Sequence, residues 1–214
     1  MPSTTYGVLI ADVMESRAHA DLRGLLGRKL AAISSRHLRQ KLIQLPYSVT
    51  AGDEFQTVTR DLQSIPAVIL DLRRSLRPLS LRIGVGFGRV SDRIQPPVNR
   101  LGGEAFQHAR TAIENIKSGS LFKFNVLTGF DSRNAGFNET INLIYGLHDT
   151  LVLKITEKQW DTIEEFLERP SLDQTARRLK LDASTVSRNL KRGYYWQITE
   201  TVNIAGPLIK RTFS

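Results

Sequence analysis

Apolar and polar positions alternate in short blocks over the first part of the chain. The run YGVLIA at residues 6–11 predicts a buried strand that ends at Asp12. Leucines at helical spacing, with basic residues between them, predict an amphipathic helix over residues 19–44. The segment YSVTAGDEFQTVT predicts two short strands joined by a tight turn at Gly52-Asp53.

The same alternation continues to about residue 135. Apolar residues on one face predict helices over residues 65–76 and 104–117, and β-rich runs predict strands over residues 81–90 and 122–127. The order strand, helix, strand, strand, helix, strand, helix, strand mixes crossovers with one hairpin. We therefore expect an α/β sandwich with helices packed on the sheet.

The remainder of the chain has a helical pattern. Apolar residues recur at helical intervals from about residue 136 to residue 155, which predicts a connecting helix, and residues 156–214 have the pattern of an all-helical domain. The chain is accordingly divided into domains at 1–135, 136–155 and 156–214. A last helix after Tyr194 is expected either to cover the core or to pair two chains.

The segment SLDQTARRLKLDASTVSRNLKR at residues 171–192 has the pattern of a helix-turn-helix. Ser171 can cap the first helix, and Ala176 is the small residue required where the two helices cross. Val186, ten positions later, locks the second helix against the first, and Leu181 is expected to fill the turn. Lys180 stands where this motif often has glycine.

The outer face of the second helix carries short hydroxyls and basic side chains. Hydroxyls can bond phosphates or base edges, and an arginine can contact a guanine with two hydrogen bonds. The predicted DNA-binding residues are Ser184, Thr185, Ser187, Arg188, Lys191, Arg192 and Arg177. The partner would be double-stranded DNA, and a homodimer is expected because helix-turn-helix proteins usually read paired half-sites. The alternative is a plain helical hairpin with a solvated basic face.

Composition narrows the class of protein only slightly. The formal net charge of +9 and a pI near 10.1 suit a polyanionic partner without locating its site. Cysteine is absent, which excludes a disulfide scaffold and thiolate metal sites. The first residues lack the pattern of a signal peptide or a membrane span, so we expect a cytoplasmic protein without a membrane partner.

Two acidic positions stand out in the α/β part. Asp12 ends the first predicted strand, and Asp53 lies at the tip of the predicted hairpin. If those strands are neighbours, the two carboxylates converge at one sheet edge, where hard oxygen ligands suit Mg²⁺ or Mn²⁺ carrying a nucleotide triphosphate. Each aspartate alone is an ordinary turn residue, and only the combination predicts a metal site.

Four segments together resemble known nucleotide enzymes. IADVMESR resembles the first metal-aspartate motif of class III nucleotidyl cyclases, and AGDEF resembles both their hairpin Gly-Asp and the GGDEF signature of diguanylate cyclases. LRIGVGFGRV resembles the cyclase strand Arg-Ile-Gly-x-x-x-Gly, and GGEAFQHARTAIE is similar to the helix that follows it. With the downstream helix-turn-helix, the ordered set most resembles the SatD family, small bacterial proteins that pair a cyclase-like domain with a DNA-binding tail.

The resemblance implies a ferredoxin-like, nucleotidyl-cyclase-type α/β sandwich followed by an all-α helix-turn-helix domain. It implies Asp12 and Asp53 as ligands of Mg²⁺ or Mn²⁺, and Arg110 facing the phosphates of a nucleotide triphosphate. The nucleotide-binding set that it implies is Val13, Gly52, Glu54 and Arg110.

Two positions depart from the cyclase pattern. Phe106 stands where cyclases have an asparagine that helps to orient the ribose, and Ala51 replaces the first glycine of GGDEF. Phe106 cannot donate the hydrogen bond of that asparagine, which counts against ordinary cyclisation. Metal and nucleotide binding depend less on this position.

Three hypotheses for the function follow. The leading one is a DNA-binding transcriptional regulator whose cyclase-like domain senses a nucleotide and a metal. The alternative is a cyclase-type enzyme that makes a nucleotide second messenger, with the helix-turn-helix as its regulatory module. A third is a binding protein without a small ligand.

Overall fold

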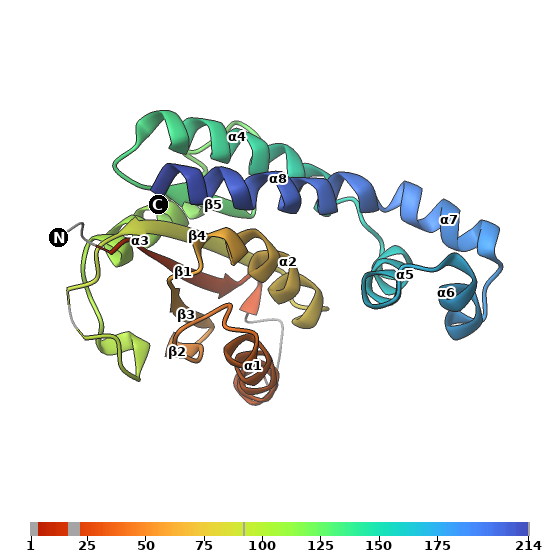
Figure 1. Ribbon diagram of the computed structural model, residues 1–214, viewed down its shortest axis with the longest axis horizontal. Coiled ribbons are helices and arrows are strands. Elements are labelled where there is room, and N and C mark those ends of the chain that lie inside the picture. Colours follow the sequence, from red (N-terminus) through yellow and green to blue (C-terminus); the bar gives the residue numbers. More distant parts are fainter. Residues whose placement is uncertain (1–3, 17–21, 92, 214) are drawn as a thin grey trace.

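The computed structural model describes residues 4–16, 22–91 and 93–213 (Figure 1). Residue 17 of the IADVMESR segment, and residues 19–21 at the start of the first predicted helix, lie outside the described residues. The strands are β1 (Tyr6–Val13), β2 (Ser48–Ala51), β3 (Glu54–Thr59), β4 (Leu81–Gly88) and β5 (Thr128–Asp131). The helices of the first part are α1 (Leu22–Arg39), α2 (Ile65–Ser75), α3 (Glu104–Ser118) and α4 (Ala135–Val152), with 3-10 turns η2 (Leu62–Ser64) and η3 (Val98–Arg100).

Four further helices follow, namely α5 (Glu157–Glu168), α6 (Leu172–Leu179), α7 (Ala183–Arg192) and α8 (Tyr195–Phe213). In Figure 1, α5, α6 and α7 form one end of the molecule, away from the sheet. None of the helices in the described part of the chain is both long and apolar enough to cross a bilayer.

The strands form one mixed sheet in the order β2-β3-β1-β4-β5. The central strand β1 is antiparallel to both β3 and β4, and β5 joins the edge parallel to β4. The prediction of a mixed α/β protein is therefore confirmed. In this register Asp12 lies between Glu54 of β3 and Arg82 of β4.

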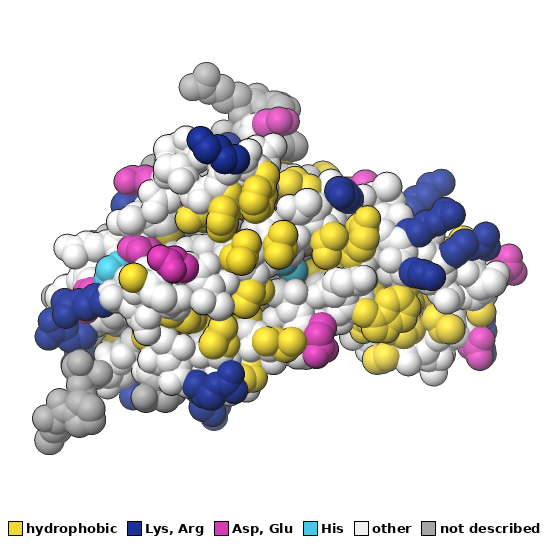
Figure 2. Space-filling view, turned by 90° about the horizontal axis from the view of Figure 1, so that it is seen from above, with side chains coloured by type: hydrophobic (Ala, Val, Ile, Leu, Met, Phe, Trp, Pro, Cys, Tyr) yellow, Lys and Arg dark blue, Asp and Glu magenta, His cyan; other side chains and the backbone are white. Residues whose placement is uncertain are grey.

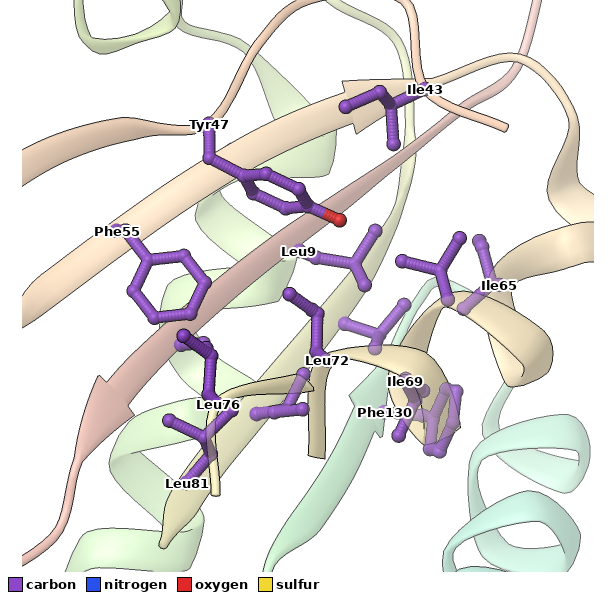
Figure 3. Close-up of a cluster of buried hydrophobic side chains, with 14 of the residues drawn as sticks. Leu9, Ile43, Tyr47, Phe55, Ile65, Ile69, Leu72, Leu76, Leu81 and Phe130 are labelled. Carbon is purple, nitrogen blue, oxygen red and sulfur yellow. The ribbon is translucent and has the colours of Figure 1, made fainter. Parts of the chain in front are cut away.

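β1 is apolar on both sides because helices cover both faces of the sheet. Leu9 and Phe55 face the core that α1 and α2 cover, where they pack with Leu72 and Leu76 (Figure 3). Val8 on the opposite face packs with residues of α3. Such a two-sided strand appears in the sequence as a continuous apolar run.

Glycines of β4 allow α3 to lie directly on the sheet. A Cβ at Gly84 would lie 2.6 Å from the carbonyl oxygen of Ala109, and one at Gly86 would meet the backbone of α3 even more closely. This contact fixes α3 over β4 and β1. The side chains of α3 that face the end of β1 are therefore held in place there.

Three predicted strand bounds were wrong. β4 ends at Gly88 rather than at residue 90. β1 continues through Val13 rather than ending at Asp12, because β3 and β4 pair with it on both sides to that point. The last strand lies at Thr128–Asp131 and not at residues 122–127. The reason is the side chain of Asp149 on α4, which accepts the Leu127 and Thr128 amides at 2.8 and 2.6 Å and fixes where the strand begins.

α8 connects the two parts of the molecule. Its first half contributes Ile198 to a core shared with α5, α6 and α7. Its second half contributes Ala205 and Ile209 to the core that α1 and α2 also cover. The ring of Phe213 stacks on that of Phe87, with centroids 4.4 Å apart. Figure 1 shows α8 running beside α4 over the α/β part. The expected role of covering the core is confirmed, and the pairing of two chains stays a prediction.

Candidate functional site

The α6–α7 pair is joined by a turn of three residues. Ser171 caps α6 by accepting the Gln174 amide at 3.4 Å. Lys180 ends that helix in the left-handed conformation at φ 55°, and the Leu181 amide then donates to the Ala176 carbonyl at 2.9 Å. Asp182 occupies the N-cap position of α7. The turn therefore consists of the C-cap of α6 followed directly by the N-cap of α7.

Small and β-branched side chains hold the pair together. Ala176, Val186 and Leu190 are buried in the same core, as the sequence predicted for the inner faces. The prediction for Leu181 was wrong, since this side chain is 39% exposed, and Leu172 is 40% exposed as well. Leu172 is the first residue of α6 and Leu181 lies in the turn, so both project beyond the region where the helices touch.

The predicted DNA-binding residues lie on the outside of the pair. Thr185 is half-buried, and its hydroxyl accepts a weak hydrogen bond from Arg188 at 3.5 Å. The other six residues are exposed, namely Ser184, Ser187, Arg188, Lys191, Arg192 and Arg177. Figure 2 shows Lys and Arg side chains gathered at the end of the molecule that these helices form.

Charge is divided between the helices at this end. α5 carries five Asp or Glu residues against one Lys, whereas residues 172–192 carry six Lys or Arg against two Asp, a net charge of +4. Three of the α5 acids surround Arg77, which donates to Glu157, Asp161 and Glu164 at 2.6, 2.8 and 3.0 Å. These acids of α5 therefore bind the α/β part, and the net positive charge of this end lies on α6 and α7.

A second cluster lies at the end of β1. The side chains of Asp12 and Glu54 are buried on the sheet face that α3 covers. Lys117 contacts Asp12 at 2.9 Å and Glu54 at 3.8 Å, and Arg82 contacts Asp12 at 3.5 Å. Arg110 donates to both carboxylate oxygens of Glu54 at 2.6 and 2.7 Å. Two carboxylates thus share three cations.

The electrostatics of the cluster favour an ionised Glu54. The hydrogen bonds from Arg110 hold the pKa of Glu54 below its ordinary value, although burial acts in the opposite direction. Arg110 was predicted to face nucleotide phosphates, and in this structure its guanidinium is occupied by Glu54. Phe106, one turn earlier on α3, packs with the apolar core on this face of the sheet.

The hairpin tip that carries Asp53 contacts the residue after Asp12 through the backbone. The Val13 amide donates to the Asp53 carbonyl at 3.2 Å, so the hairpin tip lies beside the end of β1. Gly52 allows this turn at φ 58°. One Asp12 oxygen, Oδ1, is buried without a hydrogen-bond partner, which suits a cation. The described residues contain no cluster of three or more His, Asp or Glu side chains suited to a metal.

Sequence reasoning missed Lys117 and the role of Arg82. Lys117 follows Arg110 by seven residues, which places both on the same face of α3. Arg82 is the arginine of the Arg-Ile-Gly segment, and its strand position puts it beside Asp12. Helix and strand periodicity could have found both residues once the strand order was known.

The fold and these two surfaces define a mixed α/β protein with a basic helix pair at one end and a buried carboxylate cluster in its sheet. The SatD family model matches residues 6–199, and the chain belongs to the SatD family. No curated protein matches the chain. Among solved structures, it is similar to the crystal structure of a regulator of polyketide synthase expression from Bifidobacterium adolescentis, with 14% identity over 95% of this chain and 86% of that one. The TM-score is 0.29, which indicates little shared geometry.

Proposed function

We propose that the protein is a DNA-binding transcriptional regulator in which α6 and α7 act as a helix-turn-helix, with α7 as the recognition helix. The observation that supports this most directly is the exposed face of α7. It presents Ser184, Ser187 and Arg188 outward while Val186 and Leu190 hold the opposite face in the core. Recognition helices place such polar residues against base edges in the major groove.

The basic residues around α7 have separate tasks in this proposal. Arg188 contacts a base, because a guanidinium can pair with both acceptors of guanine. Arg177, Lys191 and Arg192 contact phosphates, which fix the position of the helix without reading sequence. Three acids of α5 are paired with Arg77 of the α/β part, whose guanidinium also lies over the ring of Trp160, so these acids are neutralised there.

Selection from random double-stranded DNA, followed by gel retardation of the enriched sequence, tests the proposal. Arg188→Ala should weaken binding by about 1–3 kcal/mol and relax preference at one position. Lys191→Ala should weaken binding to all sequences and lower the salt slope by about 1. Lys158→Ala on α5 is the matched control and should change neither. Unchanged retardation by the Arg188→Ala/Lys191→Ala double variant would place the DNA surface elsewhere.

The α/β part acts in this proposal as a cyclase-type sandwich that senses a nucleotide with Mg²⁺ or Mn²⁺. The antiparallel order β2-β3-β1-β4, with α1 and α2 on the same face of the sheet, supports a ferredoxin-like arrangement. Asp12 Oδ1, the Asp53 side chain and the Val13 carbonyl would hold the ion, which would neutralise phosphate charge. α8 would transmit occupancy to α7, because it belongs to both cores.

An enzyme that makes a nucleotide second messenger is the second candidate, favoured by the paired carboxylates of Asp12 and Glu54. Phe106 and the engaged Arg110 favour sensing over turnover, because neither is available to a ribose or a phosphate. Incubation with labelled ATP or GTP and either metal separates the two functions. A product that Asp12→Ala abolishes would establish the enzyme, whereas a thermal shift without product supports the sensor.

A further inference from the structure

A cavity of about 540 Å³ opens beside the carboxylate cluster. It lies between the start of β4, the last turn of α3 and the segment at residues 122–127. This volume is in the range of small-molecule sites in proteins, about 300–1,000 Å³. None of the motifs found in the sequence falls on the segment at residues 122–127, which was expected to be a strand.

The walls of this cavity carry positive charge. Arg82, Lys117 and Lys123 line it, and no Asp or Glu is among its lining residues in the described part of the chain. Arg82 and Lys117, together with Arg110 outside the cavity, share the two carboxylates of Asp12 and Glu54, so the cluster keeps one net positive charge. Lys123 is exposed at the rim. An anionic ligand would therefore be attracted to the cavity and would reach the region of Asp12.

The same cavity carries an aromatic wall. The rings of Phe122 and Phe124 are nearly parallel, with centroids 5.0 Å apart. Both line the cavity, and Phe124 is 41% exposed. Asn125 and Ser118 add polar groups able to bond a ring edge or a sugar hydroxyl. A flat ring can stack against an exposed aromatic face in such a place.

We propose that this cavity binds a nucleotide, with its phosphates on Arg82, Lys117 and Lys123 and its base against Phe124. This rests on the proposed sensing function and assigns its ligand site, apart from Arg82, to residues outside the cyclase-like motifs. Nucleotides combine a flat ring with a multiply charged tail, as the two walls do. An inorganic anion would leave the aromatic wall unused, and an apolar acid would leave excess positive charge uncompensated.

Calorimetric titration of the full chain with five probes tests the ring and the tail separately. The probes are ATP, GTP, adenosine, guanosine and inorganic triphosphate, each with Mg²⁺. We expect one of the two nucleotides to bind at least about tenfold more tightly than its nucleoside and than triphosphate, a difference of about 1.4 kcal/mol each. Triphosphate that binds as tightly as the nucleotide would overturn the role of the aromatic wall.

Two exposed positions allow the site to be changed with little risk to folding. Lys123→Ala should weaken nucleotide binding about tenfold through the loss of one charged contact. Phe124→Ala should weaken it about tenfold through lost stacking and leave triphosphate binding unchanged. Lys158→Ala is the control for Lys123→Ala and should leave affinity unchanged. Thermal melts of each variant report folding independently.

The outcomes separate this site from the proposed function. If wild-type protein binds a nucleotide and neither Lys123→Ala nor Phe124→Ala weakens it, the sensing function stands and this site is wrong. If no nucleotide binds while DNA retardation persists, both the site and the sensing role fail, and the assignment of α7 stands.

Discussion

Lys180 holds a backbone conformation that usually requires glycine. Its φ of 55° ends α6, and its Cβ is strained in the left-handed region. The side chain is exposed and the sequence shows it following Arg177 and Arg178. A third cation beside the proposed DNA surface is a reason for a lysine here in place of the glycine that the turn favours.

The strain at Lys180 gives the first prediction. Lys180→Gly should raise the free energy of unfolding by about 1 kcal/mol, because glycine adopts this conformation without a Cβ penalty. Lys180→Ala keeps the Cβ and serves as the control. Urea unfolding followed by circular dichroism measures both. Equal stabilities of the two variants would show that the left-handed turn carries no strain.

Asp71 on α2 is the centre of a partly buried charge cluster. His37 contacts it at 2.7 Å, Arg74 donates to it at 2.6 Å, and Arg36 contacts it as well. Burial raises the pKa of Asp71, but the hydrogen bonds from His37 and Arg36 and the charge of Arg74 hold it well below the ordinary value. The ionised carboxylate thus ties α1 to α2.

The second prediction concerns acid stability. A carboxyl with a lowered folded-state pKa stabilises the fold above its unfolded pKa, and that contribution is lost as the pH falls below about 4. Asp71→Asn should therefore cost about 2 kcal/mol at pH 7, and the difference from wild type should shrink towards pH 2. Urea titrations at several pH values measure this. The exposed Asp173→Asn should follow the wild type throughout, and a constant gap for Asp71→Asn would contradict the assignment.

At the scale of elements, the sequence predicts where α8 lies but not which parts of the molecule it packs against. Apolar positions after Tyr194 predict a helix, but they do not say that its first half packs with α7 and its second half with the sheet core. Gly206 makes the second contact possible, because a Cβ there would lie 2.6 Å from the carbonyl oxygen of Gln63. The order of elements depends on local periodicity, whereas this docking depends on contacts distant in sequence.

Gly206 supplies the third prediction. Gly206→Ala should destabilise the protein by about 1–3 kcal/mol, because the added methyl group pushes α8 away from η2. The control is Gly136→Ala near the start of α4, where the nearest side-chain atom is 3.8 Å from the added Cβ. That change should be neutral or stabilising by up to about 1 kcal/mol. Thermal melts of both variants decide the matter, and two equal effects would contradict it.

The two candidate sites differ in how much of each could be predicted from the sequence. The α6–α7 pair was predictable because its cap, its small residue and its β-branch lie within one local segment. At the sheet, Asp12 and Asp53 were expected to meet at one edge, and the register brings the Asp53 carbonyl beside Val13. Lys117 lies on α3, and the periodicity of the sequence predicts that helix but not its position on the sheet. Three cations around two acids are visible only after folding.

At the scale of the whole molecule, α4 and α8 form a face with exposed apolar side chains (Figure 2). Leu143 and Leu147 on α4 and Ile204 on α8 are each at least half exposed. Exposed apolar side chains that gather on one face can mark an interaction site. A regulator that reads paired half-sites requires a second copy, and we propose that this face pairs two chains.

The last prediction tests this pairing. Wild-type protein should sediment as a dimer, and Leu147→Glu should sediment as a monomer. In the variant, pairing would bury a glutamate against its own symmetry mate at the two-fold axis, or against a leucine beside that axis. Leu38 on α1 is also an exposed leucine but lies outside this face, so Leu38→Glu should leave the dimer intact. The monomer should still retard DNA carrying one half-site but lose the added affinity of the second, since linked sites strengthen binding without new contacts. A monomeric wild type that binds its DNA as one copy would remove the need for the face, and a dimer that survives Leu147→Glu would place the pairing surface elsewhere.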